Sequence, residues 1–254
     1  MEPLQHVVAE LGLVVEVVGD ELHGTATVHP EMFVPGTSCL RLSILATWAD
    51  HVAGLLAAQA IKPRVGVTLD LDVHVHEEPV GVGAIRAVAR PIKVGRSVVV
   101  VGVEVVADDG APVGIATASF MPAPDAALTL PPLAESLAMS RGVGRPLAAP
   151  FAERARCARR EPGVAVLAVS DDGLNASKSL NGGLLALVVE EAALSAAAPG
   201  TTLASLAMRY LRPVRVGPAV ASAHVPGELA RVDVRDAGRD GRVAVAATTR
   251  AFHA

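Results

Sequence analysis

The stretch Asn175-Ala-Ser-Lys-Ser-Leu-Asn181-Gly182-Gly183-Leu-Leu-Ala-Leu-Val-Val-Glu190 joins a polar loop to a strongly apolar segment, with two glycines at the junction. The apolar segment continues to residue 197 without a proline, which predicts a helix over 182–197. Because this helix is apolar nearly all round, we expect it to be buried rather than to lie on a surface. The stretch therefore predicts a central helix enclosed by the rest of its domain.

The segments around this helix occur twice in the chain. In the second half an extended segment at 163–169 and a polar loop at 170–180 precede the helix, and four extended segments follow it, at 203–211, 219–225, 229–236 and 242–252. The first half has a short helix at 3–11, extended segments at 14–18 and 22–28, and a loop at 29–38. A long apolar helix at 40–60 comes next, followed by extended segments at 66–75, 84–91, 97–107 and 112–120. A long buried helix followed by a four-stranded antiparallel run, repeated once, predicts an α+β fold in which each sheet wraps its helix.

Composition narrows the class of protein. The chain is 51% hydrophobic but only 2% aromatic, so its core must consist mainly of Val, Ala and Leu. The net charge of −4 argues against a nucleic-acid partner, which is normally met by a strongly basic face. The most apolar runs, at 97–103 and 184–189, are too short to span a bilayer, so we expect no membrane partner.

The cysteines and the N-terminus bear on the compartment. Cys39 and Cys157 form neither a disulfide framework nor a metal-binding spacing, which suits a reducing cytoplasm. Glu2 and Glu10 stand where a signal peptide carries basic residues, so we expect a cytoplasmic protein.

The loop and helix at 175–190 resemble a signature of the hotdog superfamily, in its group of thioesterases similar to those of the phenylacetate pathway. That signature is an amide residue, then His-Gly-Gly at the start of the helix, then an acidic residue within the helix. Asn175 matches the amide, Gly182 and Gly183 match the glycines, and Glu190 matches the acid. Asn181 replaces the histidine, which leaves the role of that position open.

The helix of the first half is similar, with Asp50 at the position of the acid. Here Arg41 replaces the histidine, Leu42-Ser43 replace the glycines, and Pro35 stands at the amide position. Thr68 falls where the family often has a Ser or Thr near the acid.

The resemblance implies two tandem hotdog domains, at 1–122 and 151–254, joined by a Pro/Ala-rich linker at 123–150 and paired as an internal pseudo-dimer. Whether two such chains form a homodimer is left open. It also implies that an active site forms between two hotdog units, the acid of one facing the helix N-terminus of the other.

Applied to this chain, the resemblance implies one complete site, in which Asp50 faces Asn175, Asn181 and Gly182. Asp50 is then the general base or nucleophile, and Thr68 orients the water. We expect hydrolysis of an acyl-CoA thioester to a free acid and CoA, in fatty acid metabolism, without a metal or other cofactor. Free N–H groups at a helix start stabilise a developing oxyanion, and Gly183 and Arg41 are expected to bind substrate.

Several alternatives remain open at this point. Glu190 could be the working acid instead of Asp50, and Asp50 could form a structural ion pair with Arg41. The glycines could serve helix packing, and Asn181 could be a helix N-cap. A solvated face is expected for the arginines at 154–160, with CoA phosphate binding as the other reading.

Other functions also remain open. A metal site on the strand that carries Asp72, His74 and His76 is a weaker hypothesis, because no further ligand has recognisable spacing. A non-catalytic acyl-CoA binding module, an enoyl-CoA hydratase or dehydratase and a structural assembly partner are the competing functions. The hydratases carry a segment with Asp, His and an intervening Asn-Pro, and the chain has no such segment.

Overall fold

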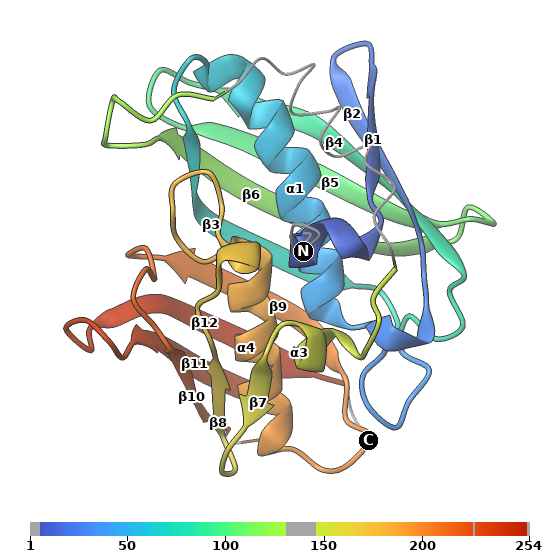
Figure 1. Ribbon diagram of the computed structural model, residues 1–254. Helices are drawn as coiled ribbons and strands as arrows, with labels where there is room; N and C mark the ends of the chain where they lie inside the picture. The colour runs from blue at the N-terminus through green and yellow to red at the C-terminus, as the bar shows by residue number, and fades with distance from the viewer. Residues whose placement is uncertain (1–5, 131–145, 226, 253–254) are drawn as a thin grey trace.

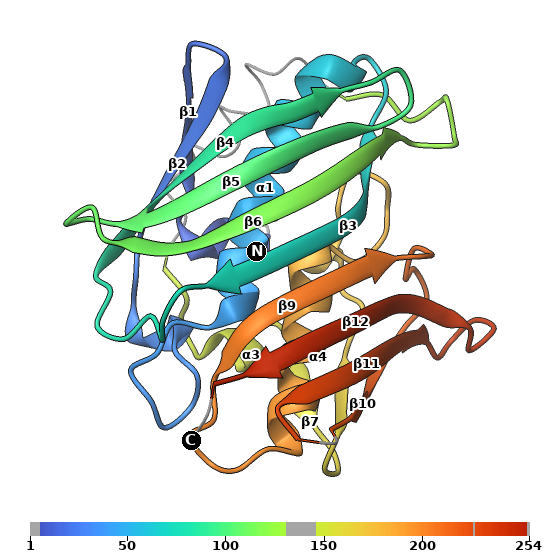
Figure 2. The ribbon, with the colours of Figure 1, turned by 180° about the vertical axis from the view of Figure 1, so that it is seen from behind.

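The computed structural model describes residues 6–130, 146–225 and 227–252. Within these ranges a single antiparallel sheet of 12 strands encloses two long helices (Figures 1 and 2). The elements of the first half are η1 (Val7–Leu11), β1 (Val14–Val18), β2 (Glu21–Thr27), η2 (Pro30–Met32), α1 (Leu42–Ile61), β3 (Gly66–Val75), β4 (Ala84–Val94), β5 (Val99–Ala107) and β6 (Pro112–Pro122). Those of the second half are α3 (Phe151–Arg154), β7 (Cys157–Arg159), β8 (Val164–Leu167), η3 (Asp171–Gly173), α4 (Gly182–Ser195), β9 (Leu203–Tyr210), β10 (Ala219–His224), β11 (Leu229–Asp236) and β12 (Val243–Ala251).

The strand order is the same in each half when it is read outward from the centre. The sheet runs β1-β2-β4-β5-β6-β3-β9-β12-β11-β10-β8-β7, so β3 and β9, the strands that follow the two long helices, lie side by side. They pair antiparallel, with the fully buried Leu71 opposite the fully buried Met208. This arrangement confirms the prediction of two tandem hotdog units paired as an internal pseudo-dimer.

The two long helices lie on the same, concave face of the sheet and pack against each other (Figure 1). Helix α1 is long and apolar enough to cross a membrane by length and composition alone, but 61% of its most apolar window is buried inside the protein. It is the core helix of the first half, and Trp48 on it is 1% exposed and donates its indole N–H to the carbonyl of Leu11. Helix α4 is buried from Gly183 to Leu194.

Some predicted elements differ from the structure. The predicted N-terminal helix is a 3-10 helix over the described residues Val7–Leu11, and α3 and β7 had not been predicted. Most of the predicted linker, residues 131–145, lies outside the described residues, so the proposed domain boundaries stay predictions. Its first part, residues 123–130, runs along the start of β3, where Val65 exchanges backbone hydrogen bonds with Ala123 and Leu128.

Candidate active site

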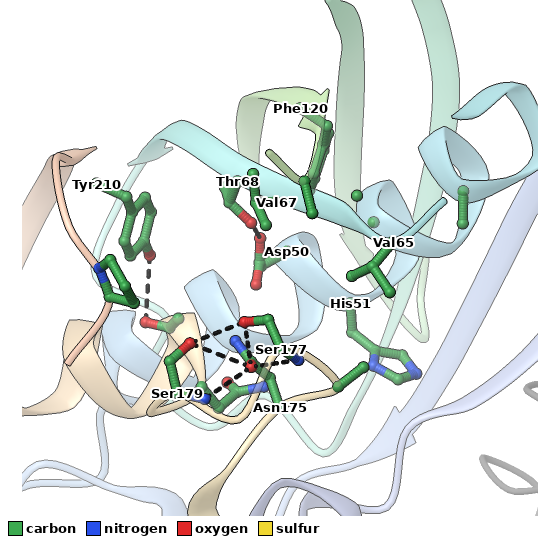
Figure 3. A pocket seen from close by; sticks show the side chains of 18 of the residues that line it. Asp50, His51, Val65, Val67, Thr68, Phe120, Asn175, Ser177, Ser179 and Tyr210 are labelled. Carbon is green, nitrogen blue, oxygen red and sulfur yellow. Dashed lines mark hydrogen bonds between the residues drawn. The ribbon is translucent and has the colours of Figure 1, made fainter. Parts of the chain in front are cut away.

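A cavity of about 1500 Å³ lies where the two halves meet. The first half contributes Asp50 from α1 and Thr68 from β3 to its wall, and the second half contributes Asn175, Gly182 and Tyr210 (Figure 3). Asn181 also lines the cavity, so the structure brings together five of the predicted site residues, from three separate segments of the sequence. Most of the remaining wall is apolar.

Asp50 stands in the middle of α1 and is partly buried, with its carboxylate reaching the cavity. Its Oδ1 accepts a hydrogen bond from Thr68 Oγ1 at 3.0 Å. In the described part of the chain no cation pairs with Asp50, so the predicted alternative of an ion pair with Arg41 is wrong. Burial raises the pKa of Asp50 to about 6, and the Thr68 hydroxyl opposes this rise.

Gly182 is the first residue of α4 and lies directly in front of Asp50. A Cβ at this position would be 3.0 Å from Asp50 Oδ2 and 3.1 Å from Tyr210 Oη. Any side chain here would therefore occupy the space between the acid and the helix N-terminus. The N–H groups of Gly182 and Leu184 have no hydrogen-bond partner among the described residues, as expected for the first turn of a helix.

Asn175 organises the loop before α4. Its Oδ1 accepts hydrogen bonds from the backbone N–H and hydroxyl groups of Ser177 and Ser179, at 2.8 to 3.2 Å (Figure 3). Because backbone N–H groups only donate, the acceptor is the amide oxygen. The amide nitrogen has no partner within the described ranges and is available as a donor at the cavity wall.

Tyr210 completes this group, and the sequence reasoning did not include it. It is the only tyrosine in the chain and stands at the end of β9. Its hydroxyl donates to the carbonyl oxygen of Gly182 at 3.2 Å, and burial together with the nearby Asp50 carboxylate raises its pKa well above the usual value.

Asn181 and Gly183 serve the helix start itself. Asn181 Oδ1 accepts the N–H of Gly183 at 2.8 Å, which makes Asn181 the N-cap of α4, one of its two predicted roles. A Cβ on Gly183 would lie 2.2 Å from Thr47 Oγ1 on α1. Gly183 therefore allows the close approach of the two helices and does not line the cavity, which corrects its expected role in substrate binding.

Glu190 and Arg41 lie in a separate, closed cluster at the N-terminus of α1, with side chains 0% and 1% exposed. Glu190 Oε1 accepts the N–H groups of Leu42 and Ser43 at 2.9 and 3.4 Å, and its Oε2 accepts the Ser43 hydroxyl at 2.6 Å. Arg41 Nη1 lies 3.1 Å from Glu190 and 2.6 Å from Glu191. Neither side chain reaches the cavity, so we reassign both residues from catalysis and substrate binding to this buried cluster.

The remaining predicted candidates take structural positions. Asp72 is ion-paired with Arg209 across the β3–β9 junction. In the arginine-rich segment at 154–160, Arg154 is ion-paired with Glu10 and Asp172, and Arg159 with Glu191. Arg156, Arg159 and Arg160 are exposed, which agrees with the predicted solvated face. His51 lines the cavity, and burial lowers its pKa to about 4.

Comparisons with known proteins agree with this architecture. Residues 43–113 match the model of the thioesterase superfamily, so the match covers the half that carries Asp50. No curated protein sequence matches the chain.

Solved structures of similar shape cover most of the chain at low identity. The 12:0-ACP thioesterase from Umbellularia californica has a TM-score of 0.66 and is 12% identical over 93% of this chain and 99% of its own. The tesB protein of Mycobacterium avium subs paratuberculosis has a TM-score of 0.58 and is 17% identical over 97% of both chains. A hot dog fold protein from Alicyclobacillus acidocaldarius has a TM-score of 0.59 and is 17% identical over 98% of both chains. The chain is therefore a tandem double hotdog protein, and its first half carries the sequence pattern of the thioesterase superfamily.

Proposed function

We propose that the chain hydrolyses acyl-CoA thioesters in the cavity between its two halves, with Asp50 as the acid–base group or nucleophile. The observation that carries this proposal is that the Asp50 carboxylate lies beside the first residue of α4, with Oδ2 3.0 Å from where a Cβ on Gly182 would stand, and that the Gly182 N–H has no hydrogen-bond partner among the described residues. The match to the thioesterase superfamily supports thioester hydrolysis as the class of reaction. Attack on a thioester carbonyl needs a group that activates the nucleophile and a group that stabilises the oxyanion. The carboxylate and the N–H groups at the start of the helix can supply these two functions.

The reaction follows from these positions. The thioester carbonyl oxygen accepts hydrogen bonds from the N–H of Gly182 and the amide of Asn175, which stabilise the charge that develops on it. Asp50 removes a proton from a water molecule next to Thr68 as that water attacks the carbonyl carbon. The tetrahedral intermediate then expels the thiolate, which receives a proton, and the products are a free acid and a thiol. In the alternative, direct attack by the Asp50 carboxylate breaks the C–S bond, releases the thiolate and gives an anhydride. Water then hydrolyses the anhydride to the free acid and regenerates the carboxylate, and the proton released protonates the thiolate.

The rim of the cavity favours CoA as the carrier of the acyl group. Arg212 and Arg215 are exposed, line the cavity mouth and have no carboxylate partner in the part of the chain described. Val214 between them accepts the N–H of Leu180, so these arginines flank the loop that leads to Gly182. Free guanidinium groups at this position suit the phosphates of CoA. An acyl carrier protein is the other carrier that a basic rim accommodates.

The inner wall of the cavity supports an aliphatic acyl group. Trp48 and Tyr210 also line the cavity, but Leu55, Ala58 and Leu128 give the wall an aliphatic part, in which stands the ring of Phe120. Gly54 faces that ring, since a Cβ there would lie 3.5 Å from Phe120. An alkyl chain gains about 0.8 kcal/mol per buried methylene in such surroundings.

The direct test is thiol release from a panel of short-, medium- and long-chain and aryl acyl-CoAs. We expect turnover of at least one aliphatic member by the native chain and loss of at least about 10³-fold in kcat for Asp50→Asn, since the proton acceptor is removed. The matched control is Asp109→Asn in the exposed β5–β6 turn, which should keep full activity. Binding of acyl-CoA by calorimetry with no turnover of any member would instead make the chain an acyl-CoA binding module.

A further inference from the structure

We propose that the Glu190 carboxylate is a built-in anion that fills the second, pseudo-symmetric site and thereby positions α1, and with it Asp50, for catalysis in the open site. Its role toward Asp50 rests on the proposed thioesterase function. Its role as an occupant of the second site rests on contacts within the closed cluster alone.

The closed cluster has the parts of an anion-binding site. Two consecutive N–H groups at the start of α1, those of Leu42 and Ser43, converge on one carboxylate oxygen of Glu190. The Ser43 hydroxyl and Arg41 Nη1 converge on the other oxygen. Arg41 is fully buried, and among the described residues its Nε and Nη2 have no hydrogen-bond partner, so this buried cation depends on the carboxylates beside it.

The closed site is the cluster around Glu190 and the open site is the cavity around Asp50. They differ in whether the carboxylate reaches the N–H group at the start of the opposite helix. Leu42 N–H in the closed site corresponds to Gly182 N–H in the open site, because each belongs to the first residue of its helix. Glu190 binds the former directly, whereas no hydrogen bond joins Asp50 to the latter. Aspartate is one methylene shorter than glutamate, which leaves space for a substrate carbonyl in the open site and none in the closed one.

A short series of contacts links the closed site to the open one. The Ser43 carbonyl accepts the hydroxyl of Thr47 at 2.7 Å, and Thr47 packs directly on Gly183. Gly183 follows Gly182, and Asp50 lies about one turn beyond Thr47 on α1. By holding the first turn of α1, Glu190 therefore fixes the helix contact that also sets the spacing between Asp50 and Gly182.

The test combines truncation with refilling by a small anion. Glu190→Ala removes the carboxylate and leaves room for acetate. We expect a lower Tm and a kcat reduced roughly ten- to hundredfold with KM little changed, because the reacting groups are misplaced while the cavity wall remains. Acetate at high concentration should raise both Tm and kcat of this variant, since a ligand that binds only the folded state stabilises it. Acetamide, which has the same shape without charge, should raise neither, and the native chain measures the general effect of the salt.

The outcomes separate the two parts of the proposal. If acetate fails to raise the Tm of Glu190→Ala relative to acetamide, α1 does not hold an anion site and the proposal is overturned. If Tm falls while kcat is unchanged, Glu190 does not position Asp50. If Glu190→Ala does not fold, Ser43→Ala tests the same link more gently, with an expected fall in kcat and recovery in Ser43→Thr, which restores the hydroxyl. Absence of turnover by the native chain would reject the thioesterase proposal and leave the acetate-dependent Tm as the test of the filled site.

Discussion

Asp50 and Glu190 occupy the same position in the two core helices, each eight residues after the first helical residue, Leu42 or Gly182. The Glu190 carboxylate is hydrogen-bonded to the N-terminus of the opposite helix. Within the described ranges, the Asp50 carboxylate is hydrogen-bonded only to Thr68, and it borders the cavity. A duplicated fold thus contains one acid used in packing and one acid left accessible. The accessible acid has a raised pKa, from which the first two predictions follow.

The pH dependence of catalysis should report the ionisation of Asp50. As a base or nucleophile the carboxyl must be ionised, so kcat/KM should rise with pH and level off above about 6, the pKa that burial gives Asp50. Thr68→Val removes the hydrogen bond that lowers this pKa, so the midpoint should move to higher pH. Initial rates between pH 4.5 and 9 with one acyl-CoA measure both midpoints. A midpoint that is the same in Thr68→Val would contradict the assignment.

Asp50 should also lower stability at neutral pH. Its pKa of about 6 in the folded state lies above the ordinary 3.8, so between these values the folded chain keeps a proton that the unfolded chain has lost. The free energy of unfolding therefore falls as pH rises through this window, and the full cost remains above it. Asp50→Asn lacks this cost and should be more stable than the native chain by about 1–3 kcal/mol at pH 8. Urea unfolding at pH 8 and pH 4 checks this, because the difference should nearly vanish at the lower pH.

Substitution of the two glycines at the start of α4 should have different effects, one on activity and the other on stability. Gly182→Ala places a methyl group 3.0 Å from Asp50 Oδ2, in the space assigned to the substrate, and should reduce kcat/KM by about 10²–10³-fold with little change in Tm. Gly183→Ala places a methyl group against Thr47 and should cost about 1–3 kcal/mol of stability by overpacking. Adding Thr47→Ala should recover part of that loss, since it removes two of the three clashing atoms. Equal effects of the two single changes on activity and stability would argue against separate roles.

The duplicated architecture could be predicted from the sequence because the hydrophobic periodicity and the positions of the turn residues agree in both halves. The strands β3 and β11 begin and end at the predicted residues, since turn residues bound valine-rich runs on both sides. The short elements α3 and β7 have no such periodicity, and their positions depend on contacts with distant segments. Arg154, for example, is held by Glu10 and Asp172.

The residues of the candidate site could be predicted only where residue type and spacing match a motif. Asp50, Thr68, Asn175 and Gly182 meet at one cavity, as the resemblance implied. Arg41 was misassigned because its partners, Glu190 and Glu191, are about 150 residues away in sequence and the pairing depends on how the helices pack. Tyr210 was missed for the same reason, since its position at the end of a strand becomes meaningful only when β9 is placed beside α4.

Substitutions in the basic rim should affect binding of the CoA carrier without affecting hydrolysis of the thioester bond. CoA presents phosphates to Arg212 and Arg215, whereas an N-acetylcysteamine thioester of the same acyl group has none. The double change Arg212→Ala with Arg215→Ala should therefore raise KM for the acyl-CoA by about tenfold, or roughly 1.4 kcal/mol, and leave kinetics with the truncated thioester unchanged. Added salt should raise KM of the native chain for acyl-CoA toward that of the variant, because exposed charges are screened. Arg96→Ala, an exposed arginine between β4 and β5, is the matched control and should change neither substrate. If the double variant retains the native KM for acyl-CoA but loses turnover of an acyl carrier protein substrate, the rim serves that protein, and the carrier assignment must be reversed.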